Sequence, residues 1–210
     1  MTRILRGRGR AGRGDDRGAA LVEFALILPV VTVLLLGIFE YGNLWRQVGT
    51  LERAAQQGAR AVTQQADGRF ADYEALRSVD SATRGMSGVE VTRVIVYLPA
   101  DANGSVPDSC LSSSVPEVCN TYSGTQVRTV NPVGFPTAGG ASNPTCAGGS
   151  WDAGWCPTTR PRSDTNPMQV GVHVTVEYTP VTGLIPGPTM TVTRQAIYQI
   201  EPCSRGQSTC

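Results

Sequence analysis

The sequence predicts an α+β protein. A long N-terminal helix, first transmembrane and then amphipathic, is expected to pack on a small antiparallel β-sheet with a Cys/Gly/Pro-rich insertion. Three observations support this: an apolar segment lies near the N-terminus, helical periodicity continues beyond it, and segments rich in β-branched residues follow. At 210 residues the chain has room for one ordinary domain in addition to an anchor.

The anchor is predicted from residues 19–39, an apolar segment of 21 residues. As an α-helix it would be roughly 31 Å long at about 1.5 Å per residue, close to the hydrocarbon thickness of a bilayer. Tyr41 and Trp45 follow the segment, at the level where interfacial aromatic side chains are enriched. Residues 19–42 are therefore predicted to cross the lipid bilayer once, as a transmembrane helix.

The distribution of charge predicts the orientation of this anchor. Residues 1–18 hold six arginines and two aspartates, a balance of +4, whereas residues 41–210 have a balance of −1. Because basic flanks stay on the cytoplasmic side, residues 1–18 are predicted to be a cytoplasmic leader. Residues 43–210 would then form an extracytoplasmic domain, outside the cytoplasmic membrane. A cleaved signal peptide is the alternative, but the uncharged run 24–39 exceeds the usual apolar core of about 7–15 residues.

A single carboxylate, Glu23, lies about one turn inside the apolar segment. A charged group in hydrocarbon is costly, so such residues usually mark a function or a specific partner. The alternative is that Glu23 reaches the headgroups, with Arg17 nearby. Position alone leaves both interpretations open.

The residues around Glu23 favour the functional interpretation. Gly18 closes the basic leader, and Glu23 occupies the fifth place after it. This arrangement resembles the processing site of type IV pilin-like proteins. Together with Pro29, the pair Leu36-Gly37 and the triplet Glu40-Tyr41-Gly42, the segment also resembles the TadE-like family, which are pseudopilins of the tight-adherence (Flp) pilus machinery.

The resemblance implies a role without catalysis, as a minor subunit or an assembly factor of such a pilus. A membrane prepilin-type peptidase would cut between Gly18 and Ala19 and leave the α-amino group of Ala19 at the start of the helix. Glu23 of one subunit would pair with that amino group of a neighbour, so that neither charge stays unpaired in hydrocarbon. The expected partners are the lipid bilayer, the peptidase, other pilin-like subunits and the pilus assembly machinery.

Beyond the anchor, apolar residues recur at intervals of three and four with charged residues between them, which extends the predicted helix over residues 19–65. A second helix is predicted over residues 70–84. Strands are predicted at residues 89–98, 168–178 and 189–200, with the last two paired antiparallel. One face of the strand 168–178 is predicted to be solvated, namely Gln169, Gly171, His173, Thr175 and Glu177.

Residues 99–167 are predicted to be an insertion stapled by disulfides. The six cysteines all follow the apolar segment, as expected in an oxidising compartment, and they are Cys110, Cys119, Cys146, Cys156, Cys203 and Cys210. Three disulfides are predicted, and sequential pairing is the simplest of the possible connectivities, among which the sequence does not choose. Trp151 and Trp155 are predicted to be buried within the insertion; if exposed, they would suit adhesion or sugar stacking.

The sequence contains no recognisable set of catalytic residues. It has one histidine, His173, which is predicted to lie exposed on a strand, and no GxSxG, HExxH, Walker or dinucleotide motif. We therefore expect no enzyme activity, cofactor, metal or small-molecule substrate, and the balance of −1 beyond the anchor argues against nucleic acid. The alternative to a pilus component is a membrane-tethered extracellular binding or adhesion module that does not polymerise.

Overall fold

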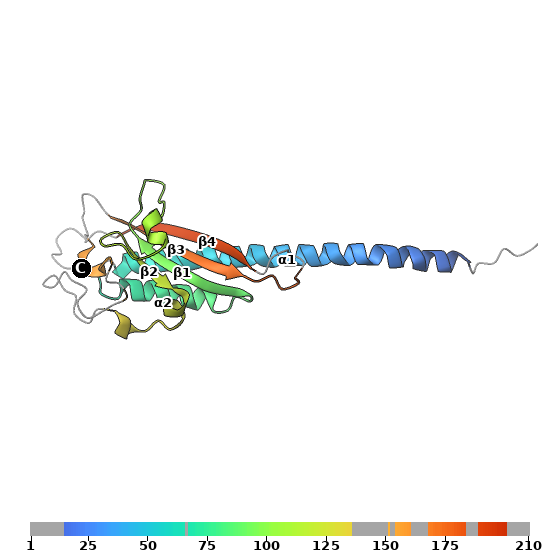
Figure 1. The fold of residues 1–210 in the computed structure, drawn as a ribbon, viewed down its shortest axis with the longest axis horizontal. Helices are drawn as coiled ribbons and strands as arrows, with labels where there is room; N and C mark the ends of the chain where they lie inside the picture. The colour runs from blue at the N-terminus through green and yellow to red at the C-terminus, as the bar shows by residue number, and fades with distance from the viewer. Residues whose placement is uncertain are drawn as a thin grey trace, which may run out of the picture.

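The computed structural model describes residues 15–65, 67–135, 151, 154–160, 168–183 and 189–200. The helices within them are α1 (Asp15–Gln65), α2 (Ala71–Thr83) and α3 (Gly124–Arg128). The strands are β1 (Val89–Tyr97), β2 (Cys119–Ser123), β3 (Gln169–Tyr178) and β4 (Met190–Gln199) (Figure 1). The predicted α+β fold is confirmed, because a long N-terminal helix accompanies an antiparallel sheet and a disulfide in the insertion.

The four strands form one antiparallel sheet in the order β2-β1-β3-β4. The predicted pairing of the last two strands is confirmed, with a regular register from Gln169 opposite Gln199 to Tyr178 opposite Met190. Strand β2, with the sequence CNTYS, was not predicted from the sequence. It is short and mostly polar, so it carries no period-two apolar signal.

The second half of α1 and the whole of α2 cover one face of the sheet (Figure 1). Leu51, Ala55 and Ala59 of α1 are fully buried there with Leu76 and Val79 of α2. Small side chains on α1 allow α2 and β3 to approach it closely. A Cβ added at Gly58 would lie 3.0 Å from Val79 Cγ2 and 3.3 Å from Val172 Cγ1. The predicted end of the first helix at residue 65 is confirmed, and the helix begins at Asp15, ahead of the predicted residue 19.

The opposite face of the sheet is solvated only in part: Gln169 and Glu177 of β3 are exposed as predicted, but residues of the insertion cover the centre of this face. Gly171 and His173 of β3 are buried, so the prediction of an exposed histidine is wrong. A second, smaller core forms there from Ile95 and Tyr97 of β1 with Cys110 and Cys119. Alternation along a strand shows that two faces differ in polarity, but it does not show what later segments pack on the polar face.

The insertion is folded over its first part. Cys110 and Cys119 form a disulfide, and β2 leads directly into α3, whose start is fixed by a capping box between Ser123 and Gln126. Cys156 is also disulfide-bonded. The remaining cysteines, at positions 146, 203 and 210, lie outside the described residues. Trp155 is buried, as predicted, and Trp151 is half-buried against the ring of Phe135.

Candidate functional site

The first half of α1 exposes its apolar side chains on all sides. It projects away from the sheet as a single continuous helix (Figure 1). The large apolar residues from Leu21 to Phe39 are exposed. The most apolar stretch of 18 residues in this helix has a mean hydropathy of 2.6, and none of its residues is buried within the described structure. By length and composition this helix is a candidate membrane span.

The residues predicted to direct processing and assembly lie at the start of this exposed half. Gly18, Ala19 and Glu23 are all helical and exposed. Ala19 and Glu23 are four positions apart, so both lie on the same side of α1, one turn from each other. A Cβ added at Gly18 would meet no atom within 4 Å. The carboxylate of Glu23 is thus open to a second molecule.

Glu40 differs from Glu23, because it is buried at the point where α1 meets the domain. Its side chain is 1% exposed. The hydroxyl of Tyr178 donates to one carboxylate oxygen at 2.6 Å, and the backbone N–H groups of Val181 and Thr182 donate to the carboxylate at 2.9 and 2.8 Å. This carboxylate therefore fastens the end of β3 and the turn after it to the helix.

The hydroxyl of Tyr178 connects this contact to a further residue of α1. It accepts a hydrogen bond from Asn43 Nδ2 at 3.1 Å while it donates to Glu40. Burial raises the pKa of Tyr178, and the hydrogen bond to Glu40 acts in the same direction. The phenol therefore stays protonated at neutral pH and keeps its role as a donor.

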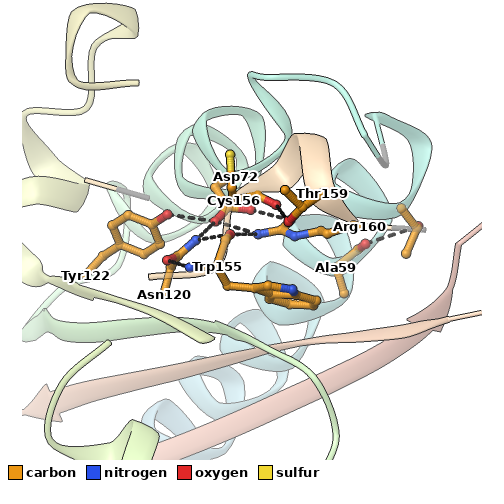
Figure 2. Close-up of polar contacts among 9 residues, drawn as sticks. Ala59, Asp72, Asn120, Tyr122, Trp155, Cys156, Thr159 and Arg160 are labelled. Carbon is orange, nitrogen blue, oxygen red and sulfur yellow. Dashed lines mark hydrogen bonds and ion pairs between the residues drawn. The ribbon is translucent and has the colours of Figure 1, made fainter. Parts of the chain in front are cut away.

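A second buried polar cluster holds residues 155–160, a later part of the insertion, against α2 and β2 (Figure 2). Arg160 donates to Asp72 in a bidentate pair, with Nη1–Oδ1 at 2.6 Å and Nη2–Oδ2 at 3.0 Å, and both side chains are fully buried. The hydroxyl of Tyr122 and the Nδ2 of Asn120 also donate to Asp72 Oδ2, at 2.7 and 2.8 Å. The charge on Asp72 is thus compensated by one cation and two neutral donors.

Trp155 attaches the insertion to this cluster through its backbone and its ring. The backbone N–H of Trp155 donates to Asn120 Oδ1 at 2.7 Å. Its backbone carbonyl accepts from Asn120 Nδ2 at 2.8 Å and from Arg160 Nη2 at 3.0 Å. The Arg160 guanidinium lies 4.2 Å from the centroid of the Trp155 ring. Because Asp72 and Arg160 are fully buried, a substrate has no access to them. The cluster therefore has a structural role and holds Trp155 and Arg160 in place.

His173, the only histidine, has no metal-binding neighbours within the part of the chain that the structure describes. It lies opposite Ile95 of β1 and Gln195 of β4 in the sheet register. Burial lowers the pKa of His173, and the positive charge of Arg93 lowers it further. The imidazole is therefore held neutral in the folded protein at neutral pH.

This burial predicts a pH dependence of stability. A histidine with a lowered folded pKa takes up a proton on unfolding, so the free energy of unfolding should fall as the pH drops below about 6.5, the ordinary pKa of histidine. Urea unfolding of the full chain in detergent, followed by near-UV circular dichroism between pH 7.5 and pH 5, should show this decline. In His173→Gln the decline should be clearly shallower, since no other side chain ordinarily titrates in this range. Equal slopes for both proteins would contradict the prediction.

The contacts of two buried carboxylates, Glu40 and Asp72, were not predicted from the sequence. Glu40 was recognised only within a sequence pattern, although an acidic residue just after an apolar segment is itself a signal that a partner is required. Asp72 lies in the first turn of α2, where acidic residues are common on solvated helices, so nothing local distinguishes it. Its partner Arg160 is 88 residues away in an irregular segment.

These features define a class: an α+β protein whose core helix continues outward as an exposed apolar helix. Residues 18–60 match the model of the TadE-like protein family, and this match supports the resemblance inferred from the sequence. The match indicates a protein associated with the Tad pilus. No curated protein and no solved structure matches the chain.

Proposed function

We propose that this protein is a membrane-anchored pseudopilin that acts as a minor subunit or assembly factor of a bacterial tight-adherence (Flp type) pilus. The observation that carries the proposal is the exposed apolar half of α1, which bears a single carboxylate, the exposed Glu23, within the matched segment. Its N-terminus would face the cytoplasm, and residues 43–210 would lie outside the cytoplasmic membrane.

Processing would begin at the bond between Gly18 and Ala19. This bond lies in the first turns of α1, which begins at Asp15. A prepilin-type peptidase would need these turns to open, and a glycine favours opening because it costs a helix about 1 kcal/mol relative to alanine. Cleavage would leave the charged amino group of Ala19 at the new end of the helix.

Assembly would then use Glu23 of one subunit and the amino group of Ala19 on another pilin-like subunit. Each charge alone is costly in hydrocarbon, and pairing removes both costs while it fixes the stagger of neighbouring helices. Because α1 runs without a break from Glu23 into the core, that stagger also sets the position of the folded domain.

The first test is the N-terminal residue and the intact mass of the protein isolated from its native membrane. A chain that begins at Ala19 would support processing by a prepilin-type peptidase. A chain that retains residues 1–18 would contradict the proposal and favour the non-polymerising, membrane-tethered binding module.

Replacing Glu23 with alanine should reduce assembly and leave membrane insertion intact or improved, because the substitution removes a charge from the apolar helix. Assembly is measured as the amount of surface pili, and insertion as the fraction that remains in the membrane after a carbonate wash. Glu52→Ala is the matched control, since Glu52 is an exposed carboxylate of the same helix beyond the apolar half. Normal piliation with Glu23→Ala would show that the pairing does not occur.

A further inference from the structure

The turn that follows β3 lies at the level where α1 would leave the bilayer. The apolar segment ends at Phe39, so Glu40 stands at the outer boundary of the hydrocarbon when residues 19–39 span it. The N–H groups of Val181 and Thr182 lie within 2.9 Å of the Glu40 carboxylate. The backbone of the turn is thereby held against α1 beside Glu40.

The turn presents an apolar side chain outward. Val181 is 60% exposed, although its own backbone N–H is bonded to a buried group. Ile38, Phe39, Tyr41 and Trp45 of α1 are exposed around the same level. An apolar or aromatic belt at the edge of a membrane span is the arrangement that headgroup regions accommodate.

We propose that residues 179–183 rest in the headgroup region of the bilayer as a second membrane contact beside α1, and that Glu40 is the positioning residue that sets their depth. The partner is a phospholipid surface. This inference rests on the proposed membrane anchor, because without a bilayer around residues 19–39 the turn has no lipid to touch. Two contacts would fix the tilt of the domain, which one helix alone leaves free to vary.

The charges near the turn indicate that the contact does not select anionic lipid. Glu90 and Glu177 lie opposite each other on β1 and β3, next to the pair of Val89 and Tyr178 that ends the sheet on this side. Arg46 of α1 is exposed at the same end. Arg84 at the end of α2 is also exposed, but it pairs with Asp80, so the described residues of this rim include no group of unpaired cations of the kind that draws a protein to acidic headgroups.

The test measures the depth of Val181 directly. The full chain carrying Val181→Cys, with its native disulfides oxidised, is labelled with a nitroxide and reconstituted into phosphatidylcholine vesicles. Relaxation of the nitroxide by oxygen, which concentrates in lipid, is compared with relaxation by a water-soluble nickel complex. Leu34→Cys provides the lipid reference and Val133→Cys, 81% exposed, the water reference, and unsubstituted protein gives the labelling background.

The oxygen-to-nickel ratio at position 181 should lie between the two references and shift clearly toward that of position 34. It should remain the same when phosphatidylglycerol is added to the vesicles. Adding Glu40→Ala should shift the ratio at position 181 toward the water reference and leave the ratio at position 34 unchanged.

A ratio at position 181 equal to the water reference, with position 34 in lipid, would overturn this inference and leave the anchor intact. A ratio at position 34 equal to the water reference would overturn the anchor and this inference together. If position 181 contacts lipid only in vesicles that contain phosphatidylglycerol, the contact is not the apolar one described here. If Glu40→Ala leaves the oxygen-to-nickel ratio at position 181 unchanged, Glu40 does not set the depth of the turn.

Discussion

Replacing Asp72 with alanine should lower the free energy of unfolding by about 3–5 kcal/mol, because the substitution leaves a buried guanidinium without its counter-charge. Arg160 is fully buried, so water cannot replace the lost carboxylate. The hydroxyl of Tyr122 and the Nδ2 of Asn120 would also lose an acceptor. The measurement is urea unfolding of the full chain in detergent, followed by near-UV circular dichroism.

Glu74→Ala is the matched control for this prediction. Glu74 lies in the same first turn of α2 and contacts Arg77 at 3.7 Å, but Arg77 is exposed and Glu74 partly exposed, so the loss of this pair should cost less than about 1 kcal/mol. A double-mutant cycle with Arg160→Ala should give a large coupling energy, since the two side chains form one bidentate pair. A cost for Asp72→Ala as small as that of Glu74→Ala would show that the cluster does not hold the insertion in place.

Replacing Gly171 with alanine should lower the free energy of unfolding by about 3 kcal/mol, the upper part of the usual range for overpacking. A Cβ at this position would lie 2.3 Å from Cζ and 2.7 Å from the hydroxyl oxygen of Tyr97, which pairs with Gly171 in the sheet register. Tyr97 is fully buried, and its hydroxyl donates to the carbonyl of Gly104 at 2.9 Å. Burial raises the pKa of Tyr97 to about 12, so this donor persists over the usable pH range.

The same unfolding measurement tests this prediction, with Gly49→Ala as the control. Gly49 lies inside α1 with no atom within 4 Å of an added Cβ, so alanine there should stabilise the protein by up to about 1 kcal/mol. The two glycine substitutions should therefore have opposite signs. Gly171→Ala with unchanged stability would mean that the loop containing Gly104 moves away and that the face is open, as its polar sequence pattern suggests.

The candidate site was predictable where its signal is local. Glu23 is conspicuous because it interrupts an apolar run, and Gly18 because it ends a basic leader five positions earlier. Whether the chain is cut after Gly18 and whether Glu23 pairs with a neighbour remain predictions. Which groups would bind Glu40 was not predictable, since its three donors come from residues 178–182, far along the chain.

The sequence by itself determined the long helix, the second helix and three of the four strands, because periods of 3.6 and 2 residues follow from which side of each element is buried. Only the tertiary structure decided which distant segments contact each other. The insertion covers Gly171 and His173, Arg160 pairs with Asp72, and the turn after β3 binds Glu40. These contacts join residues dozens of positions apart through single polar or small side chains. Such contacts produce no periodic pattern in the sequence, so they can be identified only from the packing of the elements in the structure.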